Sequence, residues 1–201
     1  MRKEVSNPEF WNDRYSSKTD NWTLNRPNPV LFQAVEEKLI APPGKFMAAG
    51  IGKGYDAIYA SKAGFDVTAV DFSKEALDYA KGLAAKENVK INFVQDDLFH
   101  LKNNWAEQFD FIYEYVTFCA VDPVRREELF ENFAAALKKD GVLFTVPFPI
   151  DERKGGPPFS LSLEYFYVTG SKFLKLEYYS KNINSLKPRK GNEVLMIFRK
   201  R

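Results

Sequence analysis

Three glycines within nine residues are the first sign of chemistry in this sequence. Gly50, Gly52 and Gly54 stand in AAGIGKGYD, residues 48–56, between a short apolar run and a helical pattern. Glycine lets the backbone approach a ligand closely and turn into a helix N-terminus. A dinucleotide fingerprint would place its third glycine at position 55, which is Tyr55 here. The spacing therefore argues against a nicotinamide cofactor, and a tight turn without a ligand stays open.

Two carboxylates follow, at the ends of the next two predicted strands. Asp71 comes 21 residues after Gly50, and a carboxylate there can accept hydrogen bonds from both hydroxyls of an adenosine ribose. Asp97 suits an adenine amino group, with the backbone N–H of Leu98 on the ring. The carboxyl ends of neighbouring strands are where open α/β sheets bind ligands. The pattern predicts an adenosine-containing cofactor, and polar strand-end surface is the alternative.

These residues need a scaffold, and apolar strands alternate with helical patterns along the chain. The predicted strands cover residues 45–49, 66–70, 89–94, 109–116 and 142–146. The predicted helices cover residues 56–63, a segment capped by Ser73, and residues 123–137 with Gly141 at its end. The last two strands, 173–180 and 193–199, have no helix between them and predict an antiparallel hairpin at one edge. The alternation predicts an α/β fold with a doubly wound, mostly parallel sheet in a single domain, residues 1–201.

Composition excludes several classes of protein. The chain has 29 Lys and Arg against 27 Asp and Glu, and a net charge of +2 gives no general reason to bind nucleic acid or a membrane. One cysteine, Cys119, and one histidine, His100, exclude an internal disulfide and most metal sites, so we expect no metal. The start lacks an apolar signal-peptide core and no transmembrane run is present, so a cytoplasmic protein is expected. Late basic residues are expected to be solvated surface: Lys187, Arg189, Lys190 and 199–201.

Several longer motifs occur in a recognisable order. They are FWNDRY (10–15), NWTLNRPNP (21–29), GIGKGYD (50–56), VDFS (70–73), FVQDDLF (93–99), FDFIYEYVTFCAVDP (109–123), GGPPF (155–159) and PRKGNE (188–193). Together they resemble the class I S-adenosylmethionine-dependent methyltransferases, which are Rossmann-like. More narrowly, they resemble the thiopurine methyltransferase superfamily and its halide/thiol methyltransferases.

The resemblance implies S-adenosyl-L-methionine as cofactor and S-adenosyl-L-homocysteine as product. It implies cofactor contacts from Trp11, Tyr15, Trp22, the turn of Gly50, Gly52 and Gly54, Asp71, Asp97, Leu98 and Tyr115. It also implies a seven-stranded sheet, with residues 1–44 as a helical lid over the cofactor; helices are predicted at 8–15 and 28–39. Phe148 and Phe159 stand where plant relatives tend to have Tyr, and both are expected at the acceptor pocket.

The expected reaction is an in-line methyl transfer to a small soft nucleophile in a dry aromatic pocket. Halide, thiocyanate, bisulfide and thiol acceptors are anionic or partly so at neutral pH, so they need no strong base, and no catalytic residue is assigned. A thiopurine or other larger aromatic thiol is the alternative acceptor. A nicotinamide-dependent oxidoreductase and a cofactor-binding protein without turnover are the rival functions.

Four further expectations concern three side chains near this chemistry and the oligomeric state. Glu114, inside an aromatic strand, faces the cofactor or acceptor, or serves as a structural partner. Cys119 is expected to be a small buried hydrophobe, and His100 a surface residue. No extra dimerisation segment is visible, so we expect a monomer.

Overall fold

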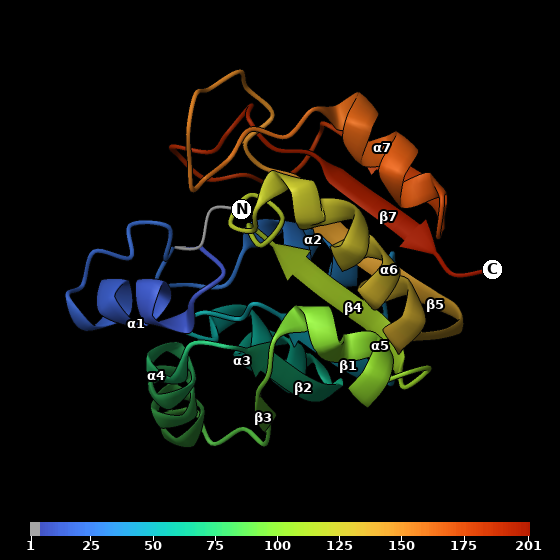
Figure 1. Ribbon diagram of the computed structural model, residues 1–201. Coiled ribbons are helices and arrows are strands. Elements are labelled where there is room, and N and C mark those ends of the chain that lie inside the picture. Colours follow the sequence, from blue (N-terminus) through green and yellow to red (C-terminus); the bar gives the residue numbers. More distant parts are fainter. Residues whose placement is uncertain (1–4) are drawn as a thin grey trace.

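The computed structural model describes residues 5–201 and is built on a seven-stranded sheet in the order β3-β2-β1-β4-β5-β7-β6 (Figure 1). The strands are β1 (Lys45–Ala49), β2 (Asp66–Asp71), β3 (Asn92–Gln95), β4 (Phe109–Tyr115), β5 (Leu137–Val146), β6 (Lys175–Ser180) and β7 (Leu195–Arg199). Strands β1 to β5 pair in parallel, whereas β7 pairs antiparallel with both β5 and β6. The predicted sheet, with its antiparallel C-terminal hairpin, is confirmed.

Helices cover both faces of the sheet. The helices are α1 (Pro8–Ser16), α2 (Pro29–Glu36), α3 (Tyr55–Ala63), α4 (Lys74–Lys86), α5 (Leu101–Asn104), α6 (Arg126–Ala136) and α7 (Leu163–Ser171). One apolar core joins α2 and α3 to the sheet, with Leu31 and Phe46 fully buried in it. The other joins α5, α6 and α7 to the opposite face through residues such as Phe130 and Phe166. This arrangement confirms the doubly wound architecture.

Local sequence explains where the best-predicted helices begin. The side chain of Asn28 accepts a hydrogen bond from the Val30 amide, and Pro29 takes the first turn of α2. Ser73 caps α4 in the same way by accepting from the Ala76 amide. Both caps were predicted from sequence, and each starts a helix whose apolar face packs inward.

The region between β3 and β5 differs from the prediction. A 3₁₀ turn, η2 (Pro123–Arg125), leads into α6, which ends at Ala136. Strand β5 begins at once, so the prediction of Gly141 as a helix end was wrong. An irregularity in the pairing with β4 takes up residues 138–141, with Asp140 at a φ of 62°. The short elements η1 (Leu98–His100) and α5 were not predicted.

Helix α7 was also not predicted. Several of its large apolar side chains face solvent, with Tyr165, Tyr167 and Val168 between 44% and 52% exposed. Outward apolar residues obscure the amphipathic pattern by which a helix is recognised in sequence. Helix α7 follows β5 and precedes β6 in the chain, and it helps to cover the antiparallel part of the sheet (Figure 1).

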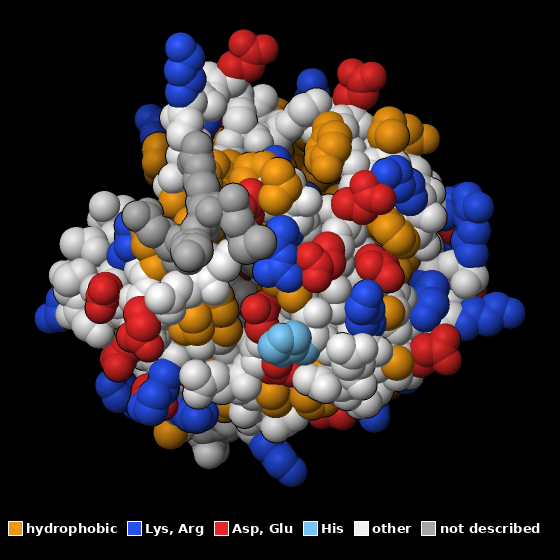
Figure 2. All heavy atoms as spheres, in the orientation of Figure 1, with side chains coloured by type: hydrophobic (Ala, Val, Ile, Leu, Met, Phe, Trp, Pro, Cys, Tyr) orange, Lys and Arg blue, Asp and Glu red, His pale blue; other side chains and the backbone are white. Residues whose placement is uncertain are grey.

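The parallel strands bring the predicted polar residues to one edge. Ala49 at the end of β1 pairs with Val70 on one side and Glu114 on the other, so the carboxyl ends of β2, β1 and β4 are level. Helix α1 packs against α4 beside this edge. Figure 2 shows acidic and basic side chains interspersed on one face of the molecule. Within residues 5–201, no helix is long and apolar enough to cross a membrane, and no cluster of His, Cys, Asp and Glu could hold a metal.

Candidate active site

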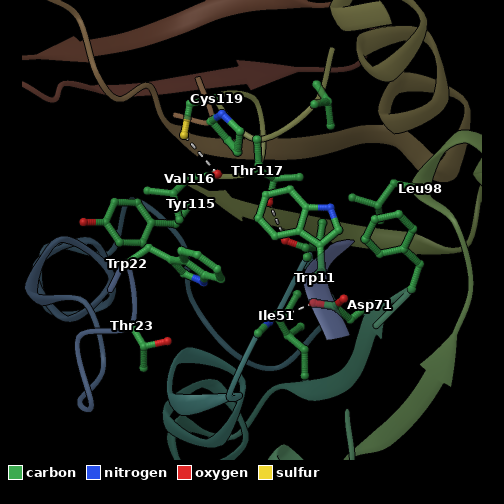
Figure 3. A pocket seen from close by; sticks show the side chains of 18 of the residues that line it. Trp11, Trp22, Thr23, Ile51, Asp71, Leu98, Tyr115, Val116, Thr117 and Cys119 are labelled. Atoms are coloured by element: carbon green, nitrogen blue, oxygen red, sulfur yellow. Dashed lines mark hydrogen bonds between the residues drawn. The ribbon is translucent and has the colours of Figure 1, made fainter. Parts of the chain in front are cut away.

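A cavity of about 250 Å³ lies at the carboxyl ends of the parallel strands. Trp11, Trp22, Leu98 and Tyr115 point into it from widely separated parts of the chain (Figure 3). We call the part around Gly50, Gly52, Asp71 and Asp97 the glycine end, and the part formed by Tyr115, Phe148, Pro157, Pro158 and Arg189 the arginine end. The two ends are built differently and are described in turn.

The glycine turn follows β1 and keeps its backbone close to other chain segments. Gly50 has a φ of +63°, and a Cβ on it would lie 2.5 Å from the Thr117 Oγ1. Gly52 has a φ of +52°, and its Cβ would lie 2.9 Å from the Tyr15 hydroxyl. Residues with a side chain rarely adopt this left-handed backbone conformation. Both positions therefore favour glycine, because of the backbone angle and because of the close contact. The predicted turn is therefore a backbone-lined floor of the cavity.

Asp71 ends β2 and is only 7% exposed. Its two carboxylate oxygens accept hydrogen bonds from the backbone amides of Gly52 (2.9 Å) and Ser73 (2.9 Å). Burial raises its pKa to about 6, against the lowering effect of these amides. The two amides hold the carboxylate in a fixed orientation. Each oxygen still has a lone pair with which it can accept a further hydrogen bond, for example from a hydroxyl group.

Asp97 follows β3 and caps the 3₁₀ turn that carries Leu98. Its Oδ1 accepts from the Phe99 amide at 3.1 Å. Asp97 and the buried Leu98 both line the cavity, next to Asp71. The two predicted strand-end carboxylates are thus brought together at the glycine end, as the parallel topology requires.

Residues 5–24, which we call the N-terminal lid, are part of the predicted covering segment 1–44, of which residues 1–4 lie outside the described residues, and they bring aromatic rings to this edge. The Trp11 and Trp22 rings meet edge to face with centroids 5.5 Å apart, and Tyr15 and Trp22 meet at 5.6 Å. Trp22 Nε1 donates to the Tyr15 hydroxyl. An ion pair of 2.8 Å between Asp20 and Lys53, both mostly shielded from water, fastens the lid to the glycine turn. The three rings predicted to cover the cofactor thus all line the cavity.

The end of β4 is held by a buried carboxylate. Glu114, 1% exposed, accepts from the backbone amides of Thr117 (2.7 Å) and Phe118 (3.1 Å) and from the Thr145 hydroxyl. Burial raises its pKa to about 7. Between these residues Val116 has a φ of 61°, a strained conformation for a β-branched side chain. Of the alternatives for Glu114, the structure supports the structural partner, which holds a strained turn at the cavity wall.

Tyr115 and Arg189 form the core of the arginine end. The Tyr115 hydroxyl donates to Glu193 at 3.0 Å, and the Arg189 guanidinium stacks 4.7 Å from the Tyr115 ring and 5.2 Å from the Phe148 ring. Arg189 is 4% exposed, so the expectation of a solvated surface residue was wrong. One of its nitrogens donates to the Trp22 carbonyl, while the buried Nη1 has no partner. A guanidinium nitrogen is therefore free at a residue that lines the cavity.

The two predicted acceptor phenylalanines are placed differently. Phe148 lines the cavity. From the GGPPF loop the cavity wall is formed by Pro157 and Pro158, whereas Phe159 is 4% exposed and packs in one cluster with Val5 and Trp11. The two prolines form the cavity surface, and the Phe159 side chain packs behind that surface in the protein interior.

Asp56 is a cavity residue that sequence reasoning did not select. Its oxygens accept from the Asn28 amide (2.6 Å) and the Tyr113 hydroxyl (2.9 Å), and burial raises its pKa to about 6. The signal was available, since Asp56 ends the GIGKGYD motif. Through these two hydrogen bonds, Asp56 connects the start of α2 at Asn28 to Tyr113 on β4.

Cys119 and His100 are not placed for catalysis. Cys119 is buried, its Sγ donates to the Val116 carbonyl at 3.1 Å, and burial raises the pKa of the thiol to about 12. A thiol in that environment is not a nucleophile at neutral pH. His100 is 60% exposed and contacts Asp96. Both observations agree with the sequence interpretation of these residues.

Eleven of the twelve predicted site residues therefore line one cavity, Phe159 being the exception. The chain matches the thiopurine S-methyltransferase family over residues 6–200. It is 33% identical over 195 residues to Probable thiol methyltransferase 2 of Arabidopsis thaliana, covering 94% of this chain and 84% of that protein. It is 29% identical over 197 residues to Thiocyanate methyltransferase 1 of Brassica oleracea, with the same coverage of both chains.

Solved structures show the same fold. The 1,6-didemethyltoxoflavin-N1-methyltransferase of Burkholderia thailandensis, solved with S-adenosylhomocysteine, superposes with a TM-score of 0.73 at 19% identity. That match covers 96% of this chain and 86% of the other. Fold and family together define a class I S-adenosylmethionine-dependent methyltransferase. The chain belongs to the thiopurine S-methyltransferase family, among relatives of the thiol and thiocyanate type.

Proposed function

We propose that this protein transfers the methyl group of S-adenosylmethionine to a small soft anion: thiocyanate, halide, bisulfide or a thiolate. The observation that carries the proposal is the buried Arg189 with its free Nη1 at the aromatic arginine end of the cavity. A buried cation without a carboxylate contact is costly unless an anion joins it. Tyr115 and Phe148 on either side offer the apolar, polarisable surface that a soft anion prefers to water.

The residues of the glycine end fit the adenosine part of the cofactor. Asp71 is assigned the two ribose hydroxyls, since both of its oxygens are fixed and keep acceptor capacity. Asp97 and the Leu98 amide are assigned the adenine edge. Gly50 and Gly52 bring the backbone of the turn against Thr117 and Tyr15, which also line the cavity, whereas Gly54 packs closely against Ala80 of α4. The fit is supported by the fixed Asp71 carboxylate beside the cavity and by the glycine turn, whose backbone forms part of the cavity lining.

Trp11, Tyr15 and Trp22 are assigned the role of covering the cofactor and excluding water. When bound, the cofactor would supply an activated methyl group: an anion would bond to the methyl carbon in line as the carbon–sulfonium bond breaks, with S-adenosylhomocysteine as the leaving group and no proton to remove. The aromatic faces favour a nearby cation by roughly 0.5–2 kcal/mol. The dry wall strips water from the anion, while Arg189 orients it. No side chain has to remove a proton from a halide or thiocyanate.

The test is headspace mass spectrometry of the purified protein with S-adenosylmethionine and thiocyanate, iodide or bisulfide, each supplied separately. We expect a methylated volatile above the enzyme-free blank for at least one of them. A thiopurine assayed in parallel by liquid chromatography tests the larger aromatic acceptor. Product from the thiopurine alone would contradict the small-anion assignment and leave methyl transfer intact.

Calorimetry with S-adenosylhomocysteine and with NAD separates the remaining possibilities. Binding of the homocysteine without any product would identify a binding protein that lacks turnover. Binding of NAD in preference would overturn the cofactor assignment as well.

A further inference from the structure

Arg126 is a second buried arginine near the arginine end of the cavity, and the methyl-transfer proposal does not use it. It is the first residue of α6 and is 4% exposed. Its Nε donates to the Phe118 carbonyl at 3.0 Å, Nη1 to the Ser160 carbonyl at 2.9 Å and Nη2 to the Phe159 carbonyl at 3.2 Å. All three of its nitrogens therefore hold main-chain oxygens.

These oxygens belong to two segments that are distant in sequence. Phe118 is in the turn after β4, and residues 159–160 are in the loop after β5. The Phe159 amide also donates to the Cys119 carbonyl at 2.7 Å, so the segments are joined twice. Each segment sends residues into the cavity: Cys119 and Ala120 from the first, Pro157 and Pro158 from the second. Arg126 and this main-chain hydrogen bond therefore together hold the two walls of the cavity against each other.

We propose that Arg126 is a positioning residue that sets the width of the acceptor pocket and so determines which acceptors fit. The inference rests on the proposed function, because it assigns the pocket between these two segments to the acceptor. Only a planar guanidinium presents three nitrogens in one fixed plane; an ammonium is a single point donor and cannot reproduce the span. Arg126 touches no cofactor-assigned residue among its hydrogen-bond partners, so its effect is separable from cofactor binding.

The experiment compares Arg126→Lys and Arg126→Gln with the wild type. The readouts are KM and kcat for thiocyanate, the rate ratio between thiocyanate and a bulkier aromatic thiol, and the Kd for S-adenosylhomocysteine. We expect KM for thiocyanate to rise roughly tenfold or more, the ratio to move toward the bulkier thiol, and the Kd to stay within about twofold. Arg199→Lys is the matched control. Arg199 is the last residue of β7, and like Arg126 it donates to a main-chain carbonyl, that of Asp140, at a distance of 2.6 Å.

Phe159→Leu provides a variant that keeps Arg126 and loosens the same loop. If Arg126 acts through that loop, the change in acceptor ratio from the two substitutions is non-additive in the double variant. Loss of activity with a parallel loss of cofactor affinity, or an unchanged acceptor ratio in folded Arg126→Lys, would overturn the assignment of Arg126. Wild-type protein that methylates no acceptor overturns the proposed function itself, so the two failures are distinguishable.

Discussion

The glycine end and the arginine end of the cavity are built from different kinds of structure. The glycine end uses strand termini and a helix-initiating turn, where Asp71 and the backbone of Gly52 hold each other. The arginine end uses the turn after β4, a proline loop after β5 and a segment before β7, and buried arginines hold them together. The first depends on sheet topology, the second on individual long side chains. If the two ends hold cofactor and acceptor as proposed, substitutions at the arginine end should change the acceptor without changing the cofactor.

The largest effect is expected at the glycine end, from Asp71→Ala. The substitution removes the carboxylate proposed to accept the ribose hydroxyls and leaves the Gly52 and Ser73 amides without their partner. We expect S-adenosylhomocysteine binding to weaken by about 1.5–3 kcal/mol, the range for hydrogen bonds to a charged group. Titration calorimetry measures it, with Asp78→Ala on the exposed face of α4 as control. Unchanged affinity would remove Asp71 from the ribose site.

At the other end, Arg189→Gln should affect the acceptor first. We expect kcat/KM for thiocyanate to fall roughly 10- to 100-fold, because the buried anion loses a charged partner. Arg189→Lys keeps the charge but loses the planar fork, so its loss should be smaller. Steady-state kinetics at saturating cofactor measures both variants. Equal losses in the two variants would point to the hydrogen bond with the Trp22 carbonyl rather than to the charge.

The pH dependence should separate ligand affinity from stability. The pKa of Asp71 is about 6 and that of Glu114 about 7 in the fold, both raised by burial, so the folded apoprotein holds protons that the unfolded chain has released. Lowering the pH from 7 to 5 should therefore stabilise the apoprotein, while cofactor affinity falls up to about tenfold per unit below pH 6. Thermal unfolding and calorimetry over this range measure the two trends. Parallel rather than opposite trends would contradict the role of an ionised Asp71.

The smallest effect is expected from Phe148→Tyr, which adds one hydroxyl to the wall of the arginine end. We expect relative rates among thiocyanate, iodide and bisulfide to change about two- to fivefold, within the roughly 1 kcal/mol of one polar contact, with cofactor affinity unaltered. Competition assays with mixed acceptors are sensitive enough to detect this. Phe32→Tyr, at an exposed ring on α2, is the control for adding a hydroxyl elsewhere.

The same contrast explains what could be predicted from sequence. The shared position of Asp71, Asp97 and the glycine turn at one cavity could be predicted because each follows a strand, and strand ends can be recognised from apolar patterns. Arg189 was misinterpreted because a basic residue between Lys187 and Lys190 looks like solvated surface. Its burial comes from long-range packing on Tyr115 and Phe148, which no local pattern reports.

Arg126 was missed although a signal existed. It precedes Leu129, Phe130 and Phe133 at three, four and seven residues, so it belongs to the apolar face of its helix. A charged residue on such a face is buried and needs partners. Those partners are carbonyls on two distant loops, and their identity follows only from the tertiary fold.

The link between Asp20 and Lys53 has a kinetic consequence. The pair fastens the lid to the glycine turn, and both side chains are mostly shielded from bulk water. If the spent nucleoside leaves past that lid, the two shielded charges must separate, which adds to the barrier for its exit. We expect exit of the product to govern steady-state turnover. Rate-limiting product release predicts a rapid burst of product in the first turnover, followed by a slower linear phase.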